Sequence, residues 1–244
     1  LTDRWGGRAT ILIALGGSAV CNTGMAVVFA SRGTEGAPDM LLSLKVLNAL
    51  NMYFQSFGAV SIVKVNAHWF HVRERGVLGG LFGILISLGL YFSYDWSLLL
   101  FRGASVVAPF WVPAAVLAAM FFLALSIIRD SPSHAGLKDF DTGDATSGQQ
   151  HPDPLSVVVR RLFAQPVIWI LIAIEFCSGF LRQAVMKQYR PYAVALEQSQ
   201  SFVYENLGML LCIAGILGGV FAGTISDHVF GSRRGPVASI LYAG

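Results

Sequence analysis

The chain has 244 residues, of which 55% are apolar and only 13% are charged, and its mean hydropathy is +0.61. A soluble domain usually carries about 25% charged residues, so this composition indicates an integral membrane protein. The net charge is +3, and no basic face is left outside the short loops, so nucleic-acid binding is a poor explanation of the basic residues. The sequence contains no phosphate-cradling loop, nucleophile elbow or zinc pattern, so we expect neither an enzyme nor a bound cofactor or metal ion.

The apolar residues form stretches that are each long enough to cross about 30 Å of hydrocarbon as an α-helix. These stretches cover residues 9–30, 39–63, 76–101, 106–128, 166–188 and 202–225, and another begins near Pro236 and is cut off at Gly244. The chain begins at Leu1 and not at a methionine, and a charged segment opens it. We therefore expect an all-α membrane protein and a fragment that lacks helices at both ends.

The second predicted helix carries polar side chains inside its apolar stretch. Lys45, Asn48, Met52 and Gln55 follow the spacing i, i+3, i+7, i+10, which places them on one helix face. Polar groups inside a membrane are costly and point to function, so Asn48 and Gln55 are candidates for bonding substrate hydroxyls. Lys45 has two interpretations: a ligand-binding cation, or a side chain that reaches the outer headgroups.

The third predicted helix ends in the aromatic string Tyr91-Phe92-Ser93-Tyr94-Asp95-Trp96. Aromatic side chains of this kind are typical of the membrane interface. We therefore expect Asp95 to be a solvated or helix-capping residue near the outer surface.

Residues 129–165 form the only long polar segment, rich in Asp, Ser, Gly and Pro. Such a composition cannot bury enough apolar surface to fold alone. We expect a cytoplasmic linker here, between one helical bundle in residues 1–128 and the start of a second bundle in residues 166–244.

The next predicted helix, residues 166–188, carries an arginine well inside its apolar stretch. Arg182 shares a helix face with Glu175, and Lys187 lies a turn and a half further on. One interpretation is an internal Glu175–Arg182 ion pair that only stabilises the bundle. The other is a guanidinium that faces a central aqueous cavity and binds a phosphate or carboxylate.

Helices that cross the membrane in alternating directions leave their connecting segments on two sides of it. The basic residues are unevenly divided between these two sides. One side holds Arg4, Arg8, Lys64, Arg73, Arg75, Arg129, Lys138, Arg160, Arg161, Arg233 and Arg234, and the other holds Arg32, Arg102 and Arg190. Positive loops stay in the cytoplasm. We therefore assign the first side to the cytoplasm and expect a multi-pass protein of the bacterial inner membrane.

One short pattern occurs twice, about 220 residues apart. Residues 1–8 read Leu-Thr-Asp-Arg-Trp-Gly-Gly-Arg, and residues 223–234 read Gly-Thr-Ile-Ser-Asp-His-Val-Phe-Gly-Ser-Arg-Arg. The pattern resembles the cytoplasmic loop motif of the major facilitator superfamily, which occurs once in each half of those transporters. This resemblance implies a bundle fragment with helices 3 to 8 and the start of helix 9. It assigns a gating role to Asp3, Arg4, Gly6, Arg8, Gly223, Asp227, Arg233 and Arg234.

Further strings occur in order along the chain: Tyr53-Phe54-Gln55, His68-Trp69-Phe70, Arg73-Glu74-Arg75-Gly76, Tyr94-Asp95-Trp96, Arg129-Asp130-Ser131-Pro132 and Phe180-Leu181-Arg182. They resemble the organophosphate:phosphate antiporters, a family of glycerol-phosphate, hexose-phosphate and phosphoglycerate carriers. The resemblance implies that Arg182 is one of two arginines that bind phosphate, the other belonging to a first helix that this chain does not contain. Two positions depart from the family: Ser87 lies in a helix without the substrate-binding His of some members, and Met52 stands where several relatives have Arg.

From these features we expect a monomeric secondary transporter that exchanges a phosphorylated metabolite for inorganic phosphate by alternating access. The expected substrate-binding residues are Arg182, Lys45, Gln55, Asn48 and Lys187. Two alternatives remain open at this point. One is a proton-coupled symporter of a carboxylate or sugar, and the other is a transporter-like sensor of a phosphorylated ligand.

Overall fold

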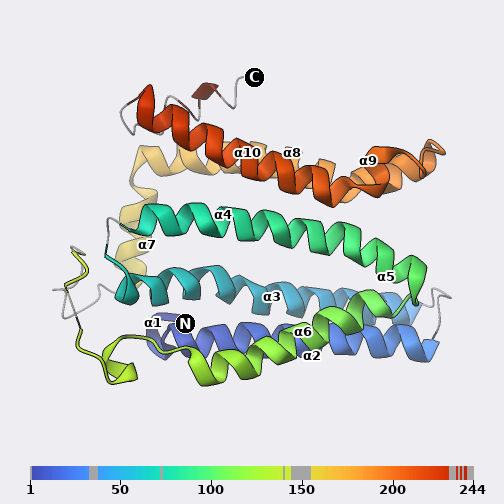
Figure 1. The fold of residues 1–244 in the computed structure, drawn as a ribbon, viewed down its shortest axis with the longest axis horizontal. Helices are drawn as coiled ribbons and strands as arrows, with labels where there is room; N and C mark the ends of the chain where they lie inside the picture. The colour runs from blue at the N-terminus through green and yellow to red at the C-terminus, as the bar shows by residue number, and fades with distance from the viewer. Residues whose placement is uncertain are drawn as a thin grey trace. The chain divides into compact units, whose positions relative to one another are not determined.

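The computed structural model describes residues 2–32, 38–71, 74–139, 141–143, 155–230, 235, 237, 239 and 240. The helices in this part of the chain are α1 (Thr2–Trp5), α2 (Gly7–Arg32), α3 (Pro38–Trp69), α4 (Arg75–Tyr91), the π-helix η1 (Phe92–Trp96), α5 (Ser97–Gly103), α6 (Ala108–Ile127), the 3₁₀-helix η2 (Ser133–Ala135), α7 (Leu155–Phe163), α8 (Pro166–Ala195), α9 (Phe202–Glu205) and α10 (Leu207–His228). Figure 1 shows their course, and none of the described residues forms a β-strand.

The predicted membrane spans are confirmed as helices. The described residues contain 6 helical segments long and apolar enough to cross a membrane: Gly7–Ser31, Asp39–Trp69, Leu78–Gly103, Ala108–Ile127, Pro166–Ala195 and Leu207–Ile225. The second segment extends six residues beyond its predicted end at residue 63, because the helix continues through polar residues such as Lys64 and Asn66. The predicted stretch that begins near Pro236 lies mostly outside the described residues.

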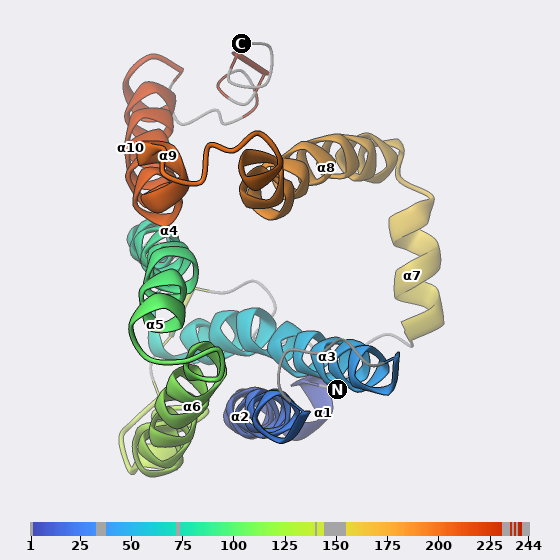
Figure 2. The ribbon, with the colours of Figure 1, turned by 90° about the vertical axis from the view of Figure 1, so that its right-hand side faces the viewer.

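The chain divides into two units, residues 1–144 together with 211–244, and residues 145–210. In the first unit α2 lies alongside both α3 and α6 (Figure 1 and Figure 2). The second unit contains α7, α8 and α9, and the guanidinium of Arg190 at the end of α8 lies 5.6 Å from the ring centre of Tyr204 in α9. The assignment of residues 129–165 as a linker stays a prediction.

Glycines on α2 allow α3 to approach it closely. The ring of Phe54 lies against Gly17, where a Cβ atom would overlap ring carbons, and Leu47 lies 3.1 Å from the position of a Cβ at Gly24. Near the start of α2, Val65 of α3 lies 2.5 Å from the position of a Cβ at Gly7. Later residues of α3 therefore meet earlier residues of α2, so the two helices run antiparallel. In lipid, helices associate through such close packing because the hydrophobic effect does not drive them together.

A small polar cluster lies within the same helix pair. Thr10 and Ser61 are completely buried, and Ser61 Oγ donates a hydrogen bond of 2.7 Å to Thr10 Oγ1. Thr10 Oγ1 in turn donates to the Gly6 carbonyl at 2.8 Å, so the hydroxyls satisfy one another away from water. On the other side of α2, Phe121 of α6 lies 3.3 Å from the position of a Cβ at Gly16. The packing of α2 therefore gives the first unit its core.

Candidate functional site

The predicted polar face of α3 does not pack against α2. Lys45, Asn48 and Gln55 are exposed, whereas the residues that meet α2 lie on another face of the helix. Asn51 is only 7% exposed, and its Oδ1 accepts a hydrogen bond of 3.2 Å from Gln55 Nε2. The buried amide therefore orients the exposed one, which is a positioning role that the sequence analysis did not assign.

The predicted cations of the second unit lie on α8. Arg182 and Lys187 are both exposed, and so is Glu175. Within the described part of the chain Glu175 and Arg182 form no ion pair, since seven residues of helix separate them by about 10 Å along the axis. Lys187 lies five positions after Arg182, which turns its side chain by roughly 140° around the helix, so the two cations do not share a face of α8. Lys45, Asn48 and Gln55 belong to the other unit.

The first copy of the repeated loop motif forms a tight junction between α1 and α2. Gly6 breaks the helix with a φ of +84°, a conformation that favours glycine. The backbone N–H of Arg8 donates a 2.6 Å hydrogen bond to Asp130 Oδ1. A Cβ at Gly6 would come within 2.8 Å of the other carboxylate oxygen of Asp130. The small residues at this turn therefore make room for a carboxylate from a segment 122 positions further along the chain.

Asp130 acts as the N-terminal cap of α2. The first backbone N–H groups of a helix lack partners within it, and the helix dipole favours a negative charge there. The sequence analysis missed this residue because it attributed Asp130 to the linker. Its position directly after an apolar stretch, at the level where α2 begins, is the signal that could have identified it.

The arginine of the same motif fastens α2 to α6. Arg8 Nη2 donates to the carbonyl oxygen of Leu125 at 2.8 Å. Nearby, Lys64 Nζ donates to the carbonyl oxygen of Thr2 at 3.0 Å, which links α3 to α1. Among the described residues, the partner of the Arg8 guanidinium is therefore a backbone carbonyl oxygen.

The other predicted gating side chains are not described. Those of Asp3, Arg4 and Asp227, and residues Arg233 and Arg234 as a whole, lie outside the described part of the chain. Gly223 lies on α10, with nothing within 4 Å of the position of a Cβ. The second copy of the motif therefore stays a prediction.

Replacing Asp130 with alanine is expected to lower the free energy of unfolding by about 1 kcal/mol, because the cap of α2 is lost. Asp130→Asn should retain most of the stability, since an asparagine oxygen also accepts from a helix N–H. Asp141→Ala is the matched control, because Asp141 is exposed and, among the described residues, accepts a hydrogen bond only from the Gly143 N–H in its own turn. Thermal unfolding of the full-length protein in detergent measures the difference. Equal midpoints for Asp130→Ala and Asp141→Ala would contradict the capping role.

Asp95 is buried, so the expectation of a solvated carboxylate is wrong. Its side chain is only 7% exposed, and it lies in the π-helix η1 between α4 and α5. The aromatic neighbours do form contacts of their own, with the rings of Phe92 and Trp96 4.7 Å apart. The error arose because an aromatic string was taken as a mark of solvent contact, although the helix continues for seven residues beyond it in α5.

Comparison with known proteins places the chain among transporters. The family model described as Major Facilitator Superfamily matches residues 1–244. The chain is 24% identical to "Glycerol-3-phosphate transporter" of Bacillus subtilis over 216 residues, which cover 80% of this chain and 46% of the relative. It is 23% identical to "Probable hexose phosphate transport protein" of Chlamydia pneumoniae, again over 80% of this chain and 46% of the relative.

A third relative has a different role in its name. The chain is 23% identical to "Membrane sensor protein UhpC" of Salmonella typhimurium, over 86% of this chain and 49% of the relative. The chain thus spans about half the length of the curated relatives it matches, and no solved structure matches it. A family model that covers every residue, together with 6 helices able to span a membrane, leads to one conclusion. The chain belongs to the major facilitator superfamily of membrane transporters.

Proposed function

We propose that the full-length protein exchanges a phosphorylated organic metabolite for inorganic phosphate across the membrane. The observation that carries this proposal is the exposed guanidinium of Arg182 on α8, a 30-residue helix with the composition of a membrane span. A charge at such a depth costs about 3 kcal/mol on insertion scales, so a compensating anion is required. Glu175 does not supply it within the described residues, which favours an arriving ligand.

The geometry of the Arg182 guanidinium suits a phosphate or a carboxylate, and phosphate is the anion that we propose. The planar guanidinium presents parallel N–H groups that bind two phosphate oxygens at once, and such charge-assisted bonds are roughly twice as strong as neutral ones. Names of relatives agree with this choice, since they include a glycerol-3-phosphate transporter and a hexose phosphate transport protein. We assign Lys187 a supporting electrostatic role, because it lies on another face of α8.

The exposed face of α3 supplies the polar groups for the organic part of the substrate. Asn48 and Gln55 offer amides that both donate and accept hydrogen bonds, as sugar or glycerol hydroxyls require. Asn51 holds the Gln55 amide in place, which lowers the entropy lost on binding. Lys45 adds a second positive charge on the same face.

We propose alternating access for the transport step. The repeated loop motif, present near Asp3 and again near Asp227, belongs to a protein built from two related halves, in which one half rocks against the other. In this proposal Asp3, Arg4, Asp227, Arg233 and Arg234 act as the cytoplasmic gate. Gly6, Arg8 and Gly223 shape the helix ends that carry the gate. A monomer is sufficient for this cycle.

A sensor is the second candidate, because a relative of similar identity is named a membrane sensor protein. Both functions need a phosphate-binding Arg182, so binding alone does not separate them. A sensor binds its ligand without moving it across the membrane. The carboxylate or sugar symporter is a weaker candidate, since the names of the relatives cited above that specify a transported molecule specify a phosphorylated one.

A ligand panel tests the proposed substrate class. Purified full-length protein should bind glycerol 3-phosphate, glucose 6-phosphate and inorganic phosphate, each in competition with the others. Glycerol, glucose and lactate should not compete at tenfold higher concentrations. Calorimetric titration measures each affinity. If lactate or free glucose displaced the bound phosphate ester, the phosphate-specific site would be wrong and the symporter would be favoured.

A further inference from the structure

Helices α4 and α10 approach each other closely inside the first unit. A Cβ atom at Gly215 of α10 would come within 2.6 Å of Ser87 Oγ in α4. Ser87 is only 7% exposed, and its hydroxyl donates a hydrogen bond of 2.9 Å to the Gly83 carbonyl oxygen of its own helix. The proton of Ser87 is therefore used within α4, and its contact with Gly215 is one of packing, which allows the two helices to tilt against each other.

From this contact towards the side that the basic loops assign to the cytoplasm, every fourth residue of both helices is a glycine for two steps. These residues, which we call the glycine rows, are Gly83 and Gly79 on α4, and Gly219 and Gly223 on α10. Residues four positions apart form one ridge on a helix surface, and each step covers about 6 Å of the axis. The two helices run in opposite directions (Figure 1), so Gly83 is level with Gly219, and Gly79 is level with Gly223.

The glycine rows are apart in the conformation described. Within the described part of the chain, nothing lies within 4 Å of a Cβ built at any of these glycines. Figure 1 shows accordingly that α4 and α10 are farther apart at the end where α4 begins than at the end where α5 follows it. A glycine inside a helix costs about 1 kcal/mol relative to alanine. The packing in this conformation does not explain why both rows consist of glycine.

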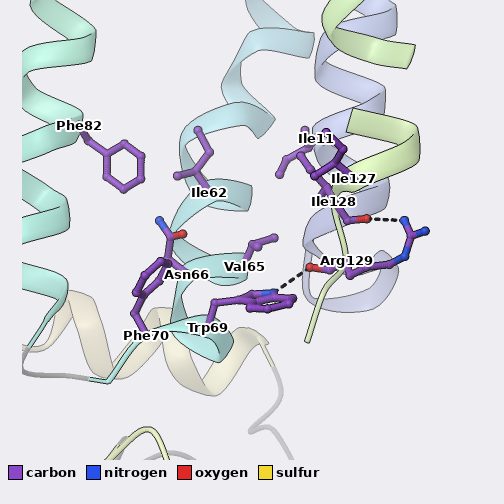
Figure 3. A pocket seen from close by; sticks show the side chains of 10 residues that line it. All are labelled: Ile11, Ile62, Val65, Asn66, Trp69, Phe70, Phe82, Ile127, Ile128 and Arg129. Carbon is purple, nitrogen blue, oxygen red and sulfur yellow. Dashed lines mark hydrogen bonds between the residues drawn. The ribbon is translucent and has the colours of Figure 1, made fainter. Parts of the chain in front are cut away.

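Another side of α4 faces α3. Phe82 lines an apolar cavity of about 410 Å³ in the first unit, and Figure 3 shows its ring extending towards Ile62 of α3. Phe82 and Ser87 are five residues apart, which separates their side chains by roughly 140° around the helix. The bulky side of α4 is therefore directed at α3, and its glycine row continues the side that meets α10 at Ser87.

We propose that the two glycine rows close against each other in a second conformation, with the contact between Ser87 and Gly215 as the pivot. This inference rests on the alternating access proposed above. Rows of small residues four positions apart let helices approach most closely in a membrane, and two such rows meet at a crossing angle of about −50°. We infer α10 as the partner of the α4 row because the rows extend, in register, the faces on which the two helices already touch. Closure of the rows shuts this helix pair on the cytoplasmic side.

Disulfide formation in the full-length protein tests the closure. The native cysteines are first replaced with alanine, at Cys21, Cys177 and Cys212. Gly83→Cys combined with Gly219→Cys should then form a disulfide under mild oxidation, because closure brings the two Cα atoms within the roughly 4–7 Å that this bond requires. Leu85→Cys combined with Leu217→Cys is the matched control, since both leucines are exposed, are level with each other, and lie about 160° round their helices from the glycine rows. The glycine pair should link about tenfold faster than this control.

The link is detected without any measurement of transport. A protease site inserted after Gln150 is cut after oxidation, and the two fragments stay joined on a non-reducing gel only if the disulfide has formed. In vesicles the linked protein should not exchange phosphate, and a reductant should restore exchange. A disulfide in a protein that exchanges nothing even when reduced would support the closure and contradict the proposed function.

The closure is overturned if the reduced protein exchanges phosphate but the glycine pair forms no disulfide, whether or not phosphate is present. It is also overturned if the glycine pair links no faster than the leucine pair, because the rows would then face lipid or another part of the full-length protein. If the first pair does not fold, Gly79→Cys combined with Gly223→Cys decides the question against the same control.

Discussion

Substituting Arg182 with lysine is expected to lower the affinity for glycerol 3-phosphate and for inorganic phosphate by about tenfold or more. The positive charge remains, but the planar pair of N–H groups that holds two phosphate oxygens is lost. A tenfold loss of affinity corresponds to about 1.4 kcal/mol, which is a typical difference between a bidentate and a single charge-assisted contact. Calorimetric titration of the full-length variant measures the change.

Arg160→Lys is the matched control for this experiment. Arg160 is an exposed arginine on α7, outside the membrane spans, and we assign it no role in binding. Its substitution should leave both affinities unchanged. Unaltered affinities in a well-inserted Arg182→Lys protein would show that only the charge of Arg182 matters. They would contradict the proposal that its planar guanidinium binds two phosphate oxygens at once.

The largest expected effect on stability comes from Gly17 on α2. A leucine there should lower the free energy of unfolding on the order of 3 kcal/mol, because even its Cβ atom overlaps the ring of Phe54 and the two helices must separate. Loss of the α2–α3 contact would also break the buried hydrogen bond between Thr10 and Ser61. The midpoint of thermal unfolding in detergent should fall accordingly.

Gly58→Leu on α3 provides the comparison, since nothing lies within 4 Å of the position of its Cβ. That variant gains helix propensity and should be as stable as the wild type or slightly more so. Adding Phe54→Ala to Gly17→Leu makes room for the new side chain and should restore part of the loss. If Gly17→Leu and Gly58→Leu unfolded at the same temperature, the close approach of α2 and α3 would not exist in the folded protein.

The fold class was accessible from the sequence because the signal for a membrane helix is local. A stretch of about 20 apolar residues has few alternatives to a spanning helix, and the spans that the structure contains begin and end close to the predicted ones. The interruption at η1 was not predicted, because residues 92–96 contain no proline or glycine to mark a change of helix type.

The packing of the helices could not be predicted from the sequence in the same way. In the described structure nothing lies within 4 Å of a Cβ built at Gly79 or Gly83 of α4. Close contacts lie at Gly7, Gly17 and Gly24 of α2, and at Gly215 of α10, where a Cβ would come within 2.6 Å of Ser87 Oγ in α4. In a helix that is apolar on every side, periodicity does not distinguish the face that meets lipid from the face that meets another helix.

Part of the candidate site could be predicted from the sequence. A charged side chain such as Arg182 is conspicuous inside an apolar stretch, so its identity needs no structure. Asp130 and Asn51 were not identified, because their roles depend on neighbours that the sequence alone does not reveal. Asp130 meets Arg8 across 122 positions, and Asn51 is distinguished from Asn48 only by being buried.

Counterflow in proteoliposomes tests the central claim most directly. The full-length protein is reconstituted into vesicles loaded with inorganic phosphate, and uptake of labelled glycerol 3-phosphate is followed with and without that internal load. The proposal predicts uptake that depends on internal phosphate, that is unaffected when the proton gradient is collapsed by an ionophore, and that is lost in Arg182→Lys at low substrate concentration. Binding of glycerol 3-phosphate without uptake would contradict exchange and identify a sensor, and uptake that required the proton gradient would identify a symporter.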